Sequence, residues 1–178
     1  LSHFAYKKNN YTECLQLIDT SIDLYFKDCM DAHIPELIHL YEGKAHCHRN
    51  LDQHKESAEA FDMLAGFHYI ERKQEYFLSA KRAAARAWYE AGEYEKSLEG
   101  HLLVSGEIDP DANDMSMGID LLNIGMAHAK LENHEAAIVS YLNARTHFKE
   151  AKNPEYVNWC DNYLAVAFTN INNGPEAK

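Results

Sequence analysis

Two arginines one helical turn apart are the residues of this sequence best suited to bind a charged ligand. Arg82 and Arg86 lie four positions apart, so on a helix their side chains share one face. The chain carries 17 Lys and Arg against 28 Asp and Glu, a formal net charge of −11, and this pair, with Lys81 beside it, reverses the local charge. Two guanidinium groups could hold a carboxylate by charge-assisted hydrogen bonds. The alternative is that they pair on a solvated face with carboxylates of the chain itself: Glu42, Glu75 or Glu90.

Two asparagines and a tryptophan offer a second kind of chemistry. Asn123 and Asn162 carry amides that both donate and accept, so each could hydrogen-bond the backbone of an extended peptide. Each could equally cap a helix or bond a neighbouring repeat. Trp159 could anchor a partner, because aromatic rings are frequent binding hot spots, or further helices could cover it.

The stretch DPDANDMSMGID at 109–120 matches a calcium-binding loop only in part. Asp109, Asp111 and Asn113 occupy the first three ligand places, and Asp120 occupies the twelfth. An EF-hand loop needs glycine at the sixth place, where Asp114 stands, and a bidentate glutamate at the twelfth. The sequence therefore predicts a loop between helices rather than a calcium site.

The cysteines and histidines form no metal or redox motif. The four cysteines are Cys14, Cys29, Cys47 and Cys160. Their spacing fits neither a zinc site nor a CxxC pair, and free thiols in helical patterns are typical of a reducing compartment. His46 and His48 flank Cys47, but residues two apart do not face each other on a helix. We expect no cofactor, no metal and a cytoplasmic location.

The composition argues against several classes of function. A net charge of −11 disfavours a general binder of DNA or anionic membranes, because contact with phosphate needs a basic face. No apolar run approaches the ~18–20 residues that cross a bilayer. Motifs of phosphate-binding loops, serine hydrolases, zinc proteases and dinucleotide sites are absent. We expect no enzyme activity, no nucleic-acid partner and no membrane partner.

The elements that must position these side chains repeat every 40 residues. Small residues recur at this interval: Ser57, Ser97, Ala137 and Ala177. Twelve residues before each stands another small residue: Ala45, Ala85, Gly125 and Ala165. Three residues after those come rings: His48, Trp88, His128 and Phe168. A second set of rings lies downstream: Phe61, His101 and Tyr141.

These spacings are typical of helical hairpins. A small residue on the first helix allows the second helix to approach, and rings fill the remaining space. Pro35 and Pro154 stand at the start of apolar-periodic runs, where a helix favours proline. Polar segments at 90–93 and 130–133 separate helices, and no strand-like alternation occurs. The sequence predicts an all-α stack of antiparallel hairpins, with Gly125 where two helices of one hairpin touch.

This pattern resembles the tetratricopeptide repeat over essentially the whole chain. That family has small residues at repeat positions eight and twenty and rings at eleven, seventeen and twenty-four. The resemblance implies an α-α superhelix, and a period of 40 instead of about 34 implies helices about three residues longer. Lys44 and Ala84 depart from the apolar residue of position seven. We expect one array over 1–178, within a longer chain: partial repeats 1–37 and 158–178, and full repeats 38–77, 78–117 and 118–157.

The resemblance also assigns roles to histidines. Four of them stand at positions eleven and seventeen, where other copies carry rings such as Trp88 and Tyr94: His48, His54, His128 and His134. It therefore implies that these imidazoles replace structural rings and do not bind metal.

The family binds partners in the groove lined by the first helix of each repeat. The corresponding residues here are Arg82, Arg86, Tyr89, Leu122, Asn123, Met126, Trp159 and Asn162, with Val166 beside them and an earlier set at His39, Glu42, His46 and Arg49. The resemblance implies a protein- or peptide-interaction module that binds an extended peptide or a helix. With Arg82 and Arg86 in the groove, we expect the ligand to be an acidic peptide or a C-terminal carboxylate. A weaker resemblance to bacterial peptide-sensing regulators (Rap phosphatases and their transcription-factor relatives) implies the alternative, a signalling-peptide-responsive domain that controls an output domain elsewhere. Self-association stays open.

Overall fold

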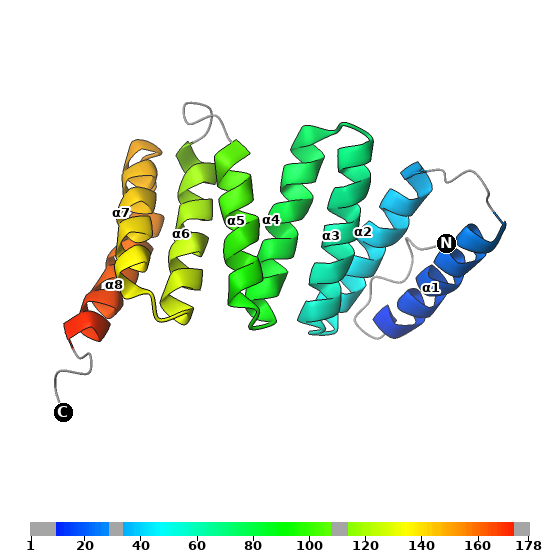
Figure 1. The fold of residues 1–178 in the computed structure, drawn as a ribbon, viewed down its shortest axis with the longest axis horizontal. Helices are drawn as coiled ribbons and strands as arrows, with labels where there is room; N and C mark the ends of the chain where they lie inside the picture. Colours follow the sequence, from blue (N-terminus) through cyan, green and yellow to red (C-terminus); the bar gives the residue numbers. More distant parts are fainter. Residues whose placement is uncertain (1–9, 29–33, 108–113, 173–178) are drawn as a thin grey trace. The chain divides into compact units, whose positions relative to one another are not determined.

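The computed structural model describes residues 10–28, 34–107 and 114–172, and these ranges are almost entirely helical. Their helices are α1 (Tyr11–Asp28), α2 (Ile34–Asn50), α3 (His54–Ile70), α4 (Gln74–Glu90), α5 (Tyr94–Glu107), α6 (Asp114–Lys130), α7 (His134–Glu150) and α8 (Pro154–Asn172) (Figure 1). No strand occurs in these ranges, so the predicted all-α class of packed antiparallel helices is confirmed. None of the described helices is long and apolar enough to cross a membrane.

The helices begin at a regular spacing. From Ile34 onward, each helix starts 20 residues after the one before it, and α2, α3, α4, α6 and α7 are 17 residues long. The 40-residue repeat is therefore two helices of nearly equal length. Pro35 lies in the first turn of α2 and Pro154 opens α8, as predicted.

Three-residue turns with a left-handed middle residue connect most of these helices. Positive φ angles occur at Asp52 (58°), Arg72 (56°), Gly92 (82°), Glu132 (60°) and Lys152 (53°). In several turns the next N–H donates back to a helix carbonyl, as from Asn133 to His128 at 2.9 Å, which satisfies a terminal C=O of the helix. Apart from Gly92, these residues have side chains that disfavour this conformation, so the sequence carried little turn signal there.

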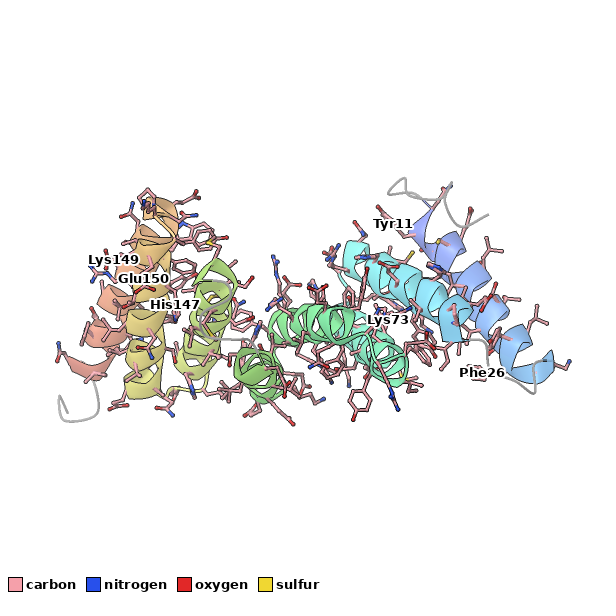
Figure 2. The ribbon with its side chains drawn as sticks, turned by 90° about the horizontal axis from the view of Figure 1, so that it is seen from above. Tyr11, Phe26, Lys73, His147, Lys149 and Glu150 are labelled. Carbon is pink, nitrogen blue, oxygen red and sulfur yellow. The ribbon has the colours of Figure 1, made fainter. Side chains whose placement is uncertain are left out.

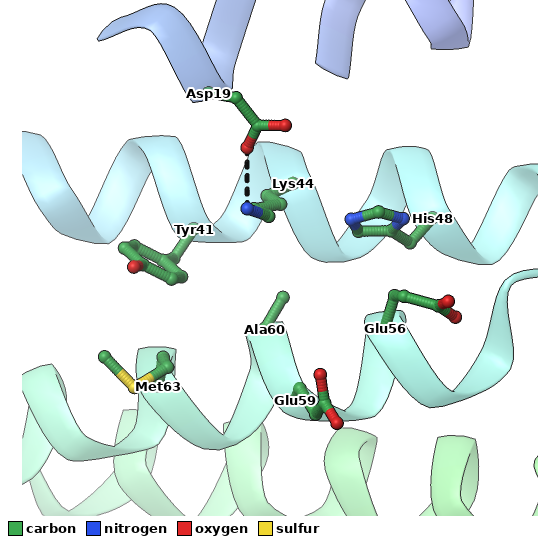
Figure 3. Close-up of a pocket in the computed structure, with 8 residues that line it drawn as sticks. All are labelled: Asp19, Tyr41, Lys44, His48, Glu56, Glu59, Ala60 and Met63. Carbon is green, nitrogen blue, oxygen red and sulfur yellow. Dashed lines mark hydrogen bonds and ion pairs between the residues drawn. The ribbon is translucent and has the colours of Figure 1, made fainter. Parts of the chain in front are cut away.

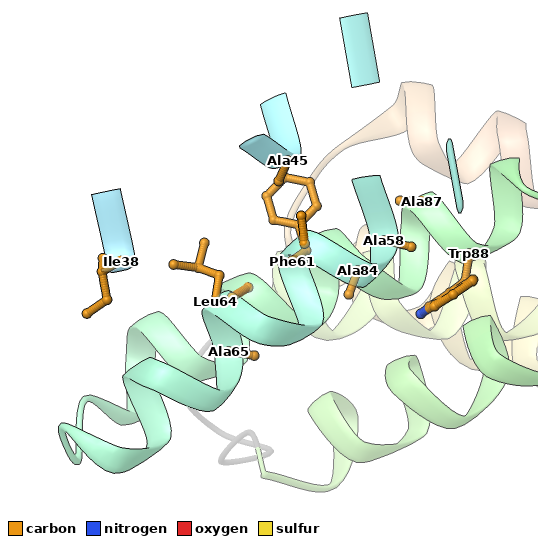
Figure 4. Close-up of a cluster of buried hydrophobic side chains, with 11 residues drawn as sticks. Ile38, Ala45, Ala58, Phe61, Leu64, Ala65, Ala84, Ala87 and Trp88 are labelled. Atoms are coloured by element: carbon orange, nitrogen blue, oxygen red, sulfur yellow. The ribbon is translucent and has the colours of Figure 1, made fainter. Parts of the chain in front are cut away.

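The chain divides into two compact units, residues 1–92 and 93–178. In unit 1, α3 packs between α2 and α4. Its core interleaves small and large side chains from these helices (Figure 4): Ala45, Ala58, Phe61, Leu64, Ala84, Ala87 and Trp88. The hydroxyl of Ser57 donates to the carbonyl of Ala45 at 2.9 Å. Ser57 and Ala45, which were predicted to face each other across a hairpin, therefore do so.

The start of unit 1 has a separate hydrophobic cluster between α1 and α2. Tyr11, Cys14, Leu15 and Ile18 of α1 pack there with Cys47 of α2. Figure 2 shows Tyr11 and Phe26 near opposite ends of α1. The buried side chains of α1 extend from Tyr11 (8% exposed) to Ile22 (8%), whereas Phe26, near the end of the helix, is 59% exposed.

In unit 2, two glycines of α6 allow rings of α7 to approach. A Cβ on Gly125 would lie 2.5 Å from Cε1 of Tyr141, and one on Gly118 would lie 2.7 Å from Cε1 of Phe148. Tyr141 is 1% exposed and Phe148 is 0% exposed, so neither ring has room to move. The prediction that Gly125 lies at a helix contact within one hairpin is confirmed.

Candidate functional site

The predicted binding residues are distributed over both units, and α4 of unit 1 carries the cationic ones. The Arg86 side chain is 76% exposed, and its Nε lies 3.9 Å from Oε1 of Glu90. The other oxygen of Glu90 lies 3.4 Å from Nδ1 of His54. Arg82 and Tyr89 are half-buried on the same helix. Of the carboxylates considered as partners for Arg86, Glu90 is therefore nearby, but only at the limit of an ion pair.

Lys81, next to this pair, is half-buried and pairs with a carboxylate of α3. Its Nζ lies 2.8 Å from Oδ1 of Asp62, and the indole N–H of Trp88 donates to Oδ2 of the same carboxylate at 2.8 Å. The carboxylate thus joins α4 to α3 through both oxygens. Lys81 stabilises the packing of α4, and the surface charge comes from the arginines.

The matching face of α2 carries His39, Glu42, His46 and Arg49. His46 is half-buried and its ring meets the edge of Phe61 at 5.5 Å between centroids. Burial lowers the pKa of His46, the neighbouring Arg49 lowers it further, and Glu42 acts in the opposite direction. Close to pH 7 this imidazole is therefore neutral and Arg49 is the cation on this face.

The predicted residues of unit 2 lie on α6 and α8, with different exposures. Leu122 is 4% exposed and belongs to the core, so its side chain packs inside the unit. Asn123 and Met126 are half-buried. On α8, Asn162 is exposed and Trp159 is 44% exposed, with its ring 4.8 Å from that of Tyr156.

A hollow of about 370 Å³ lies in unit 1 where α1, α2 and α3 meet (Figure 3). It is lined by Asp19, Tyr41, Lys44, His48, Glu56, Glu59, Ala60 and Met63. Across it, Nζ of Lys44 lies 2.6 Å from Oδ1 of Asp19. Nδ1 of His48 lies 2.8 Å from Oε1 of Gln53.

One residue that lines the hollow, Lys44, stands at a repeat position that is buried elsewhere in the chain. The residues 40, 80 and 120 positions after Lys44 are Ala84, Ile124 and Leu164, which are 1%, 3% and 7% exposed. An ammonium cannot be buried like these side chains without a large desolvation cost, and here it turns to Asp19. The sequence showed that Lys44 departs from the apolar residue expected at position seven of the repeat. It did not show the partner of Lys44, because Asp19 lies on another helix, 25 residues earlier.

A smaller hollow of about 320 Å³ lies at the α7–α8 turn of unit 2. It is lined by Phe148, Lys149, Lys152, Asn153, Pro154, Val157 and Asn158. Lys149 lies near the end of α7, next to Glu150 (Figure 2). The side chain of Asn153 accepts from the N–H of Tyr156 at 3.3 Å and so caps the start of α8.

Sequence reasoning missed a buried polar pair in unit 2. Nδ1 of His101 on α5 lies 3.1 Å from Oδ1 of Asp120 on α6, and the side chains are 1% and 0% exposed. The corresponding pairs one repeat earlier and later are Phe61 with Ala80 and Tyr141 with Cys160, all buried. One signal was available: His101 stands where the other repeats carry Phe61 and Tyr141, and Asp120, nineteen residues on, replaces a small apolar residue.

This pairing also bears on the calcium-like stretch. Asp109, Asp111 and Asn113 lie outside the described residues, whereas the Asp120 carboxylate lies in the interior and faces His101. Asp120 therefore belongs to the packing of α5 on α6. Across the described part of the chain, no three His, Cys, Asp or Glu side chains are grouped so that they could hold a metal ion.

The histidines predicted to replace rings are all half-buried: His48, His54, His128 and His134. Burial lowers the pKa of His128. Their structural role stays a prediction.

No protein-family model matches the chain, and no curated protein matches it.

Proposed function

We propose that this chain is an interaction module of the tetratricopeptide type, and that the α4 face of unit 1 binds a carboxylate of an acidic peptide or a peptide C-terminus. Arg86 provides the main contact and Arg82 lies one turn before it on the same face. Tyr89 follows Arg86 by three residues and offers an aromatic surface to the same ligand. The proposal concerns unit 1, and the exposed Trp159 and Asn162 of unit 2 form a second surface to be tested separately.

The observation that carries this proposal is the weak engagement of Arg86. Its side chain is 76% exposed, and its Nε lies 3.9 Å from the carboxylate of Glu90. An exposed ion pair of this kind contributes at most about 1 kcal/mol. Arg86 therefore loses little when it leaves Glu90 for a ligand carboxylate that accepts two parallel hydrogen bonds.

The chain's overall negative charge favours binding of an acidic peptide at the arginines of α4 over binding elsewhere on the surface. With a net charge of −11, most of the surface repels an acidic peptide, whereas the arginines attract it. Like charge elsewhere disfavours other binding modes. An acidic ligand should therefore bind near α4, and its affinity should fall as salt screens the attraction.

The experiment compares short acidic peptides that end in a free carboxylate with the same peptides ending in an amide. Peptides selected from an array on the purified chain are titrated by calorimetry. We expect the free acids to bind about tenfold more tightly than the amides, or about 1.4 kcal/mol. Arg86→Ala should remove most of this preference, and Arg86→Lys should restore only part of it, because lysine lacks the planar fork.

A matched control is Lys55→Ala, which removes one positive charge from an exposed position on α3. It should leave the affinity of the free-acid peptides nearly unchanged. If Arg82→Ala and Arg86→Ala each change the affinity less than about fivefold, which is about 1 kcal/mol, the arginines are ordinary surface residues and the proposed site is wrong.

A further inference from the structure

Two thiols meet where α1 packs on α2. Cys14 is 6% exposed and Cys47 is 1% exposed, and both belong to the hydrophobic cluster between these helices. The thiols are hydrogen-bonded to each other, and burial, together with this contact, raises the pKa of Cys47 to about 12. Both cysteines are free thiols in the structure.

Neighbouring contacts place the two cysteines opposite each other in one antiparallel register. Ile18 of α1 faces Gly43 of α2, where a Cβ would lie 3.2 Å from Cδ1 of the isoleucine. Asp19 meets Lys44 at 2.6 Å. Going one turn toward the start of α1 and one turn toward the end of α2 leads from Ile18 and Gly43 to Cys14 and Cys47. Gly43 lets the two helices approach closely. A disulfide needs this close approach, because the Cα atoms of its two cysteines lie within about 7 Å of each other.

We propose that Cys14 and Cys47 are a disulfide-forming pair that a peroxide oxidises, and that the bond fastens α1 to α2. One thiolate sulfur attacks a peroxide oxygen, the O–O bond breaks, and a sulfenic acid and water form. The second thiolate attacks the sulfenic sulfur, the S–S bond forms, the S–O bond breaks and a second water leaves. In sum, two thiols lose two protons and two electrons to one hydrogen peroxide, which becomes two waters.

The bond would act on the hollow of unit 1. Asp19 of α1 and Lys44 of α2 both line it (Figure 3). Asp19 lies five residues after Cys14 and Lys44 lies three residues before Cys47, so each is within about one and a half helical turns of its cysteine. Fastening α1 to α2 keeps the Asp19 carboxylate beside the Lys44 ammonium. In a reducing compartment the pair stays as thiols, so the disulfide would form on exposure to oxidant.

Burial sets the rate of this reaction. With both thiols covered, peroxide reaches them only when α1 opens from α2. The Cys47 thiol gives little thiolate near pH 7, since its pKa is about 12 and the thiolate is the nucleophile. Oxidation should therefore be slow in the native protein and should accelerate with rising pH.

The first experiment treats the native chain with hydrogen peroxide, alkylates remaining thiols under denaturing conditions and maps tryptic peptides. Trypsin separates the cysteines into peptides 9–27 (Cys14), 28–44 (Cys29), 45–49 (Cys47) and 153–178 (Cys160). We expect a cross-link between 9–27 and 45–49, with a mass loss of two hydrogens. Cys160, which is 0% exposed and serves as the buried control, should still be alkylated.

Two results would overturn the proposal. One is a disulfide that joins Cys29 to either cysteine in preference to the Cys14–Cys47 bond. The other is full alkylation of Cys14 and Cys47 after prolonged oxidation. Cys14→Ser and Cys47→Ser should each abolish the cross-link, whereas Cys160→Ser should leave it intact.

A second measurement does not depend on whether these variants fold. Hydrogen exchange of the 11–28 amides is compared in oxidised and reduced wild-type chain. We expect exchange to be at least about tenfold slower after oxidation, because the bond restricts opening of α1, and dithiothreitol should restore the faster rate. Equal exchange in the two states would refute the fastening of α1.

Discussion

The buried pair of His101 and Asp120 can be exchanged for the apolar pairs that the same chain uses elsewhere. Phe61 and Ala80 occupy the corresponding places in unit 1 and are 4% and 5% exposed. The test is a cycle of three variants: His101→Phe, Asp120→Ala and the double variant. The double variant copies residues that already pack at the same repeat positions.

The expected magnitudes follow from burial. His101→Phe deprives a wholly buried carboxylate of its imidazole partner, which lies at 3.1 Å, and should cost about 3–5 kcal/mol of unfolding free energy. Asp120→Ala leaves the imidazole nitrogen unpaired and removes volume, with a cost of about 1–3 kcal/mol. Replacing both partners by apolar groups is often neutral or stabilising. The double variant should therefore be more stable than His101→Phe alone.

The assay is denaturant unfolding followed by circular dichroism, with hydrogen exchange of α5 and α6 to assign the change to unit 2. Exchange is needed because two compact units need not unfold in one step. The coupling free energy, the cost of the double variant minus the two single costs, should be about −3 kcal/mol or more negative. Additive costs within about 0.5 kcal/mol would show that the two side chains do not depend on each other, and the reasoning would be refuted.

Two further predictions concern packing and pH. Gly125→Leu should cost about 1–3 kcal/mol in denaturant unfolding because Tyr141 occupies the space. Gly66→Ala, at a helical glycine with nothing within 4 Å, should instead stabilise by about 0.5–1 kcal/mol, and similar effects at both sites would contradict the assigned contact. Burial, with a smaller effect of Lys73, lowers the pKa of His68. Below about pH 6.5, His68 therefore binds a proton more readily in the unfolded chain than in the folded chain. Unit 1 should therefore lose stability as pH falls from 7.5 to 5.5, and His68→Gln should reduce that loss; an unchanged pH dependence in the variant would exclude His68 as its source.

The sequence by itself determined the helical class, the two-helix period and several helix contacts. Small residues at intervals of 40, with rings three and sixteen residues after them, define one face on each helix, and that face is set by spacing along the chain. Gly125 could therefore be assigned to a contact within a hairpin, and Pro35 and Pro154 to helix starts, without coordinates. The position-seven lysine, Lys44, was also visible as a departure.

Only the tertiary structure decided which polar side chains meet between helices. Asp19 meets Lys44, and His101 meets Asp120, across distances that depend on how two helices are rotated against each other. The same holds for Leu122, which the resemblance assigned to a binding face and which is buried in unit 2. Turn residues such as Glu132 adopt positive φ because helices on both sides fix the chain direction, and this overrides the local preference of a residue with a Cβ. Repeat spacing describes one helix at a time, whereas these contacts require two.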